Sequence, residues 1–164
     1  MDIAEYLITY CDQPSGNADR QHHALLNDLM CKRRILRIPP GAQMYREVAM
    51  LDQQGIVTGQ VDIVAYHHPQ LFLIEGKVDR ERTDKSYQDH RDKIREQLGR
   101  AFEYFSRHFG IYAEAIGVIR PEGATVFNPV RLRSRDRAIA AWPVDDIEAM
   151  LDIADLVQHP PREK

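Results

Sequence analysis

The chain has 164 residues, with 22 Lys and Arg against 25 Asp and Glu, and a formal net charge of −3. This length suits one domain with a hydrophobic core over 1–164. The slight negative charge argues against a protein that coats nucleic acid nonspecifically and with high affinity. The sequence has no apolar run long enough for a transmembrane helix and no basic N-terminal region typical of a signal peptide. We therefore expect a cytoplasmic protein with no membrane partner. Two cysteines, Cys11 and Cys31, are too few for a disulfide framework.

The first third of the chain predicts one helix and two short strands. Apolar residues recur at helical spacing, and Asn17 or Asp19 is the expected N-cap. Two consecutive prolines end the first strand, and a Gly-containing turn follows the second. The expected ranges are a turn-rich segment at 12–17, a helix over 18–33, strands over 35–38 and 44–51, and a turn at 52–55.

A hairpin and a long helix follow. Apolar, β-branched runs predict strands over 61–66 and 71–75, and the Pro-containing segment 67–70 is the expected turn between them. The long helix is expected over 86–109, with Gly110 as its C-cap. Its buried stripe is expected to consist of Ile94, Leu98, Ala101, Phe102 and Phe105.

The last third of the chain completes a predicted α/β fold. A buried strand is expected over 113–119 and a further strand over 137–142. A parallel arrangement of the first with the hairpin strands is one option. An amphipathic, acidic C-terminal helix is expected over 143–158. The strand–helix–strand order favours a mixed central β-sheet flanked by helices.

Two carboxylates and a lysine form the most informative pattern. Asp62 follows Gly59-Gln60-Val61 on one hairpin strand, and Glu75 and Lys77 lie two residues apart on the next. Residues two apart on a strand project from one face, so the hairpin can bring Asp62 beside Glu75 and Lys77. Such a group suits metal-assisted phosphodiester hydrolysis. The alternative is that Asp62 is a turn acid at a strand end and that Glu75 and Lys77 form an edge ion pair.

With this element order, the pattern resembles the PD-(D/E)XK nuclease superfamily, which includes restriction endonucleases, Holliday-junction resolvases and RecB-like exonucleases. The resemblance covers roughly Ala18 to Arg120 and implies a restriction-endonuclease-like core. Gln60-Val61 replaces the proline that the family places before the aspartate. The motif is short, and its placement on two adjacent strands ahead of a long helix is the more specific feature.

The resemblance implies catalytic roles for Asp62, Glu75 and Lys77. Asp62 and Glu75 would hold Mg²⁺ or Mn²⁺, which favour carboxylate oxygens. Lys77 would orient or deprotonate a water, or stabilise the phosphate. Glu47, on the strand before Asp62, is a further candidate metal ligand, because several RecB-like nucleases have a similar glutamate; the alternative is an exposed strand charge paired with Arg46 or Arg33.

Two histidines lie on the first expected helix, where RecB-like enzymes place a histidine ligand and resolvases a glutamate. We interpret His22 and His23 as solvated helix residues. The surrounding residues do not identify either one as a metal ligand.

The candidate DNA-binding residues are Gln97, Arg100, Arg46 and Lys85. RecB-like nucleases often have a glutamine on this long helix with an aromatic one turn later, whereas this chain has Ala101 at that place. Gln97 is equally consistent with an ordinary helix-surface position. Lys85 follows a segment in which acids, including Asp79, alternate with basic residues, so a self-neutralising surface loop is the alternative there.

The sequence thus predicts a Mg²⁺- or Mn²⁺-dependent endo- or exodeoxyribonuclease in DNA repair, recombination or defence. DNA is the expected partner; RNA would be cut by the same chemistry. A homodimer or a larger repair or defence complex is the expected assembly. The alternative function is an inactive nuclease-fold module that serves as a nucleic-acid-binding or structural subunit of a larger complex.

Overall fold

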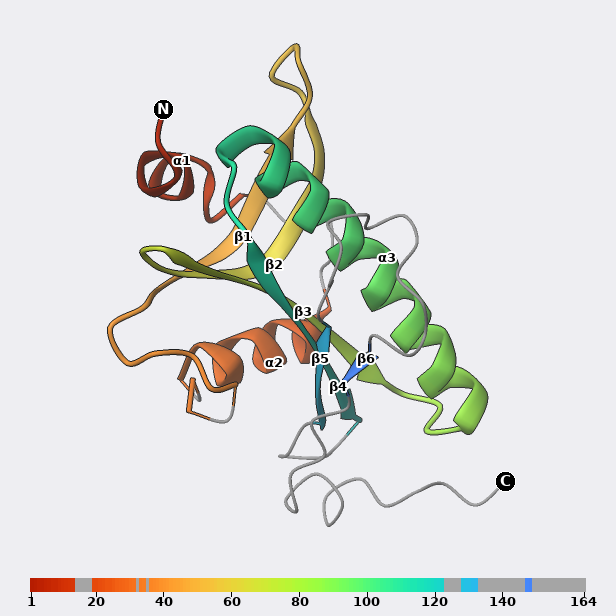
Figure 1. Ribbon diagram of the computed structural model, residues 1–164. Helices are drawn as coiled ribbons and strands as arrows, with labels where there is room; N and C mark the ends of the chain where they lie inside the picture. Colours follow the sequence, from red (N-terminus) through yellow and green to blue (C-terminus); the bar gives the residue numbers. More distant parts are fainter. Residues whose placement is uncertain (14–18, 32, 35, 123–127, 133–146, 149–164) are drawn as a thin grey trace.

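The computed structural model has an α/β fold built on one mixed sheet (Figure 1). It describes residues 1–13, 19–31, 33–34, 36–122, 128–132 and 147–148. The elements in chain order are α1 (Ile3–Tyr10), α2 (Arg20–Cys31), β1 (Gln43–Leu51), β2 (Val57–His67), β3 (Gln70–Asp79), α3 (Asp84–Phe109), β4 (Ala113–Pro121), β5 (Asn128–Leu132) and β6 (Ile147–Glu148).

The strands follow one another across the sheet in the order β1-β2-β3-β4-β5-β6. β1, β2 and β3 form an antiparallel meander, and β4 pairs in parallel with β3 after the α3 crossover. β5 and β6 continue the sheet with antiparallel pairing. The predicted mixed sheet with flanking helices is therefore confirmed. The strand after the long helix is parallel to β3, one of the two hairpin strands.

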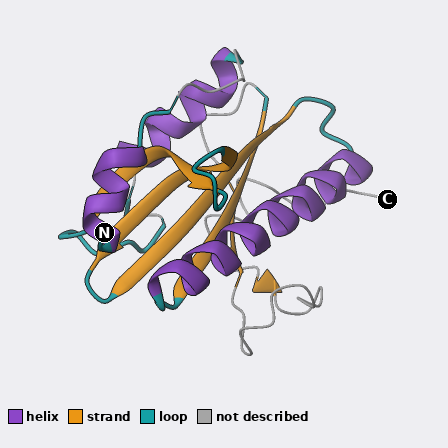
Figure 2. Cartoon of the chain, turned by 90° about the horizontal axis from the view of Figure 1, so that it is seen from above, coloured by secondary structure: helices purple, strands orange, loops and turns teal. Residues whose placement is uncertain are grey.

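The helices cover both faces of the sheet, with α2 on one side and α3 on the other (Figure 2). The apolar residues of α1 and α3 pack with one face of the sheet, and this cluster includes Phe102 and Phe105, both fully buried. Leu25, Leu26 and Leu29 of α2 pack against the opposite face. All five predicted stripe residues of the long helix are buried.

Local capping fixes both ends of α3. Thr83 and Ser86 form a reciprocal capping box at its start. Gly110 ends the helix with φ of 62°, in the left-handed region that glycine adopts without a Cβ clash, and its N–H bonds to the carbonyl of Ser106. The predicted C-cap is thus confirmed. At α2, the side chain of Asp19 accepts from the backbone N–H of Gln21, which fits one of its two proposed caps.

α1 is a helix that the sequence patterns described above did not predict. Asp2 and Glu5 form a capping box at its start, a signal that could have been found in the sequence. Ile3, Tyr6 and Leu7 follow at helical spacing and are buried. The helix is only eight residues long, so its stability depends on this packing rather than on helix propensity.

Two predicted elements need correction. The strand expected over 35–38 is wrong in the described residues 36–38, where a turn directs the N–H groups of Arg37 and Ile38 to the carbonyls of Arg34 and Arg33. The apolar pattern there arises because Leu36 and Ile38 are buried on the α2 side of the sheet.

Most of the predicted C-terminal structure, including the strand over 137–142 and the acidic helix over 143–158, lies outside the described residues. Ile147–Glu148 is the described part of that helix range and forms a strand paired with Arg131–Leu132. The helix prediction is wrong for these two residues. The edge of β5 that does not face β4 offers unpaired backbone groups, and Ile147–Glu148 pairs with this edge as a strand.

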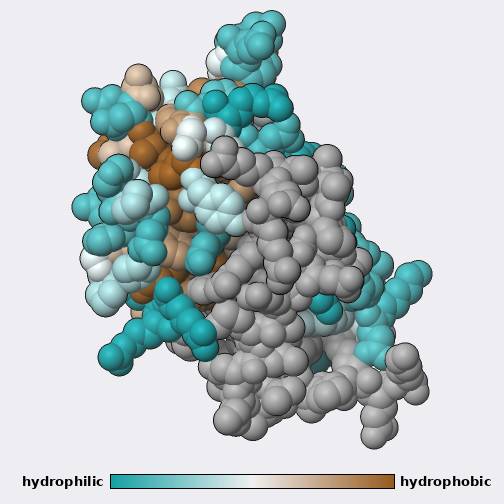
Figure 3. All heavy atoms as spheres, viewed as in Figure 1, coloured by the Kyte–Doolittle hydropathy of each residue, from teal (hydrophilic) through white to brown (hydrophobic). Residues whose placement is uncertain are grey.

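Hydrophilic side chains lie around the hydrophobic groups visible on the face drawn in Figure 3. Among the described residues, the large hydrophobic side chains left exposed are Met1, Ile8, Ile56, Val57 and Tyr112. Within the same part of the chain, no helix has the length and apolar character needed to cross a membrane.

The docking of α1 yields a stability prediction. The hydroxyl of Tyr6 donates to the carbonyl of Ala49 at 2.6 Å and bonds to the hydroxyl of Tyr104 at 2.8 Å. Tyr6→Phe removes the hydroxyl that bonds to the Ala49 carbonyl and the Tyr104 hydroxyl. We therefore expect the free energy of unfolding to fall by about 1–3 kcal/mol. Urea unfolding followed by circular dichroism measures this change.

Tyr66→Phe is the matched control, because the Tyr66 hydroxyl bonds at the surface to the exposed ring of His68. We expect a change within about 0.5 kcal/mol. Equal losses in the two variants would contradict the assigned role of Tyr6.

Candidate active site

β2 and β3 separate at Asp62 and Glu75, a position that we call the fork. The two strands pair from His67↔Gln70 to Ile63↔Ile74. Beyond this point β3 stays paired with β4, whereas β2 stays paired with β1. Asp62 and Glu75 would be the next cross-strand pair, so their side chains project from facing positions.

Each carboxylate accepts a backbone hydrogen bond at the fork. The N–H of Asp62 donates to Oε1 of Glu75 at 3.2 Å, and the N–H of Gly76 donates to Oδ2 of Asp62 at 2.9 Å. Where strands separate, N–H groups lose their ladder partners, and these side chains replace them. The separation of the strands therefore fixes the two carboxylates next to each other.

A change in side-chain alternation accompanies the fork. Tyr45 and Val48 of β1, three residues apart, both contribute to the cluster on the α3 side, as do Val61 and Val64 of β2. A regular strand would place residues three apart on opposite faces. The irregularity lies at Glu47 and Asp62. The direction of the Asp62 side chain is therefore not set by the alternation of a regular strand.

Glu47 lies opposite Asp62, because the pairs Arg46↔Ile63 and Val48↔Val61 flank the two residues. Its φ is 50°, an uncommon value for a residue other than glycine. The register thus places Glu47 at the level of the fork, on the strand from which the sequence predicted a further ligand. Arg33, a proposed partner of Glu47, instead donates to the carbonyls of Pro40 and Ala42.

His22 contacts the fork from α2, with its Nε2 3.4 Å from Oδ1 of Asp62. Its side chain is only 12% exposed, so its interpretation as a solvated helix residue is wrong. The reason is visible in the helix period: His22 precedes the buried Leu25, Leu26 and Leu29 by three, four and seven residues and shares their face. That spacing could have identified His22 from the sequence.

The two carboxylates differ in electrostatics. Burial, followed by the negative charge of Asp62, raises the pKa of Glu75 well above its usual range, and the Lys77 ammonium only partly opposes this. Burial also acts to raise the pKa of Asp62, but the interactions with His22 and the Gly76 N–H outweigh it and lower that pKa. At the fork, Glu75 is therefore the group that retains a proton.

Lys77 supplies positive charge on the same face of β3. It lies two residues after Glu75, and its ammonium lowers the pKa of both Glu75 and His90. Neither acid fits the alternative interpretation from the sequence. Asp62 lies within β2 rather than at its end, and Glu75 lies on a strand between β2 and β4 and is 3% exposed.

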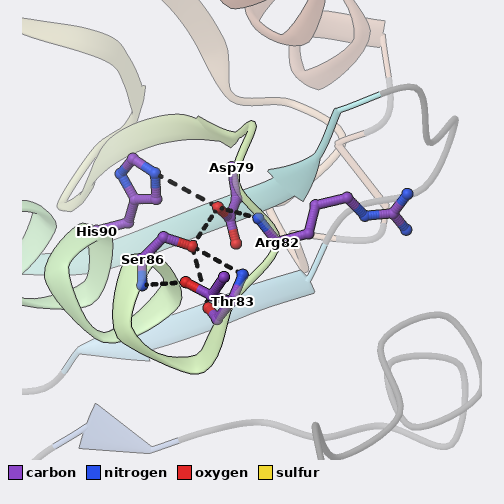
Figure 4. A network of polar contacts seen from close by, with 5 residues as sticks. All are labelled: Asp79, Arg82, Thr83, Ser86 and His90. Atoms are coloured by element: carbon purple, nitrogen blue, oxygen red, sulfur yellow. Dashed lines mark hydrogen bonds and ion pairs between the residues drawn. The ribbon is translucent and has the colours of Figure 1, made fainter.

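Asp79 follows Glu75 and Lys77 on the same face of β3 and contacts the start of α3 (Figure 4). Its Oδ1 accepts from the hydroxyl of Ser86 at 2.7 Å and from the N–H of Arg82 at 3.1 Å, and it lies 3.8 Å from Nε2 of His90. Asp79 is fully buried, so the surface-loop alternative is wrong for this residue. Its bonds connect the end of β3, two residues after Lys77, to the N-terminus of α3.

The candidate DNA-binding residues lie in different environments. Gln97 and Arg100 line one pocket beside β2. The Arg46 guanidinium bonds to Asn27 and to Nδ1 of His23 on α2, so this side chain is committed to the fold. Lys85 is exposed in the first turn of α3.

The donor set at the fork fits a hard divalent cation. Within the described ranges, no three His, Cys, Asp or Glu side chains form a ready-made metal cage. The fork offers two adjacent carboxylates, one of which is buried and has a raised pKa. Mg²⁺ is typically held by one or two carboxylates together with waters and substrate phosphates, and a cation would relieve the repulsion between Asp62 and Glu75.

Comparisons of the chain with protein-family models, with curated proteins and with solved structures find no match. A functional inference for this chain therefore depends on its site, because the same α/β architecture supports many unrelated functions.

The raised pKa of Glu75 predicts a pH-dependent stability. The folded state holds the Glu75 proton more tightly than the unfolded state, so without divalent cations the free energy of unfolding falls as pH rises above the ordinary glutamate pKa. Glu75→Gln removes the buried charge and should be more stable than wild type at about pH 8, with the difference disappearing near pH 4. Urea titrations in EDTA across this range measure the effect.

The contribution of Asp62 changes only at more acidic pH, because its folded-state pKa lies below the ordinary value. Glu103→Gln, at an exposed ion pair with Arg107, is the control and should follow the wild-type pH profile. A Glu75→Gln profile parallel to wild type would contradict a perturbed Glu75.

Proposed function

We propose that this chain is a metal-dependent nuclease of the PD-(D/E)XK type that hydrolyses DNA phosphodiester bonds. The observation that carries the proposal is the pair of adjacent carboxylates at the fork, with a lysine on the same strand face. Ordinary structural carboxylates are not arranged to repel each other in a buried position, because this arrangement costs stability. A restriction-endonuclease-like core is part of the same proposal.

Asp62 and Glu75 would hold Mg²⁺ or Mn²⁺, with Glu47 as a further candidate at the same level of the sheet. The cation supplies Lewis-acid stabilisation of the negative charge that develops on the phosphate. His22 positions Asp62 and favours its ionised form. The Gly76 N–H fixes the direction of the same carboxylate.

Lys77 is the proposed catalytic cation. Its ammonium acts on Glu75 through its charge and lies on the face of β3 that bears both Glu75 and Asp79. In this place it can donate a hydrogen bond to a phosphate oxygen or orient the attacking water. The buried Asp79 network holds the strand end that follows Lys77.

The nucleic acid would contact the α3 side of the sheet. Glu75 and Lys77 continue the two-residue spacing of Leu71 and Leu73, which pack on this side. The pocket residues Gln97 and Arg100 lie on α3 itself. Lys85, in the first turn of α3, can add a phosphate contact. Arg46 is the weakest of the four candidates, because its guanidinium bonds to α2.

A cleavage assay tests the proposal. Labelled single-stranded, duplex and branched DNA are incubated with wild type, Asp62→Asn or Lys77→Ala, in Mn²⁺, Mg²⁺ or EDTA. We expect metal-dependent cutting by wild type and a loss of about 10²-fold or more in each variant, because each removes a group that acts on the reacting phosphate.

Lys93→Ala is the matched control, since Lys93 is an exposed lysine on α3, and its activity should equal that of wild type. Cutting that survives in both site variants would contradict the assigned site. The absence of cutting on every substrate, with all proteins folded, would favour the inactive binding or structural module instead.

A further inference from the structure

A pocket of about 330 Å³ lies between α3 and the two sheet strands β1 and β2. Thr58 and Gln60 line it from β2, and Gln97, Arg100 and Tyr104 line it from α3. Its volume is at the small end of the range for ligand pockets. The lining combines two amides, a guanidinium and an aromatic ring, groups that suit a planar ligand with hydrogen-bonding edges.

The Tyr104 hydroxyl bonds to other parts of the fold and is not available to a ligand. It accepts from the N–H of Leu51 at 3.2 Å and bonds to the Tyr6 hydroxyl at 2.8 Å. Because the Tyr6 proton is donated to the carbonyl of Ala49, Tyr104 is the donor in the bond between the two tyrosines. Tyr104 therefore offers its ring as a fixed wall, and polar contacts to a ligand must come from other residues.

Gln97 provides an acceptor with no partner. Its Oε1 is buried and makes no hydrogen bond to any residue in the described part of the chain. Burying an unpaired amide oxygen costs about 1–3 kcal/mol, so a donor brought by a ligand would remove this cost. The terminal torsion of glutamine is broad, so the amide can turn its oxygen toward the pocket. Arg100, whose side chain is 65% exposed, lies at the same pocket.

The distance from the pocket to the fork is about the spacing between neighbouring nucleotides in a nucleic-acid strand. Gln60 precedes Asp62 by two residues on β2, a separation of about 7 Å along the strand. A nucleic-acid strand with one phosphate at the fork could place the neighbouring base against Gln60 and Gln97. Every nucleobase has an N–H donor on its Watson–Crick edge, but in a duplex the complementary strand occupies that edge.

We propose, on the basis of the nuclease function above, that this pocket takes one unpaired nucleobase next to the phosphate held at the fork. Gln97 Oε1 accepts from the Watson–Crick edge of the base, and the Tyr104 ring limits its depth. The substrate class is therefore single-stranded or locally unpaired nucleic acid. Regular duplex does not offer this edge.

A binding measurement tests the pocket independently of cleavage. The glutamine side-chain amide signals are followed by ¹H–¹⁵N NMR in EDTA while each of the four nucleoside 5′-monophosphates is added, with ribose 5-phosphate as the base-free probe. We expect the Gln97 signal, assigned by its absence in Gln97→Ala, to move with at least one nucleotide and not with ribose 5-phosphate. Gln97→Ala should bind about five- to tenfold more weakly.

Gln88→Ala is the matched control, because Gln88 lies on the same helix and its exposed side chain donates to Asp92. It should bind the nucleotides as wild type does. Equal weakening in both variants, or no base-dependent shift with any nucleotide, would overturn the proposal.

A cleavage comparison gives the second readout. Wild type should cut a single-stranded oligonucleotide at least about tenfold faster than the same strand in a duplex, and Gln97→Ala should narrow this ratio. Equal cutting of the two forms would overturn the proposed substrate class while leaving the nuclease function intact. If no DNA is cut, the nuclease function fails, and the NMR result alone decides whether the pocket binds a base.

Discussion

The adjacency of two carboxylates at a break in the sheet is the constraint on which the candidate site depends. Glu75 is 3% exposed and lies next to Asp62, so burial and like charge both oppose its ionisation. The fold maintains this arrangement through the hydrogen bonds that the separated strands donate to the two side chains and through His22 of α2. Such a site costs stability in the absence of a cation, a common feature of functional centres.

Much of the fold could be predicted because local signals agreed with it. β-Branched runs around a Pro-containing turn indicated the β2–β3 hairpin, and the apolar stripe and Gly110 indicated α3. The segment at 36–38 was misread because a turn can bury Leu36 and Ile38 as well as a strand can. α1 was missed although Asp2 and Glu5 form a capping box, since its eight residues depend on distant partners, including Tyr104.

The spacing of Asp62, Glu75 and Lys77 predicted that the two acids would meet, and the structure brings them together. The separation of the strands could not be predicted, because it depends on the β1–β2 irregularity at Glu47 and Asp62. The role of the Arg46 guanidinium in bonding α2 also depends on tertiary packing, as does the burial of Asp79 within an acid-rich loop. The position of His22 on the buried stripe of α2 was the signal in the sequence that could have been used.

Isothermal titration with Mn²⁺ measures whether the fork binds a divalent cation. We expect saturable binding by wild type at neutral pH and an affinity at least about tenfold weaker in Glu75→Gln, with the affinity of Glu103→Gln unchanged. Glu75→Gln preserves the shape of the side chain and its acceptor for the Asp62 N–H, so a folding defect is not expected to imitate the loss. Unchanged Mn²⁺ affinity in Glu75→Gln, or the absence of binding by wild type, would mean that the fork is not the cation site.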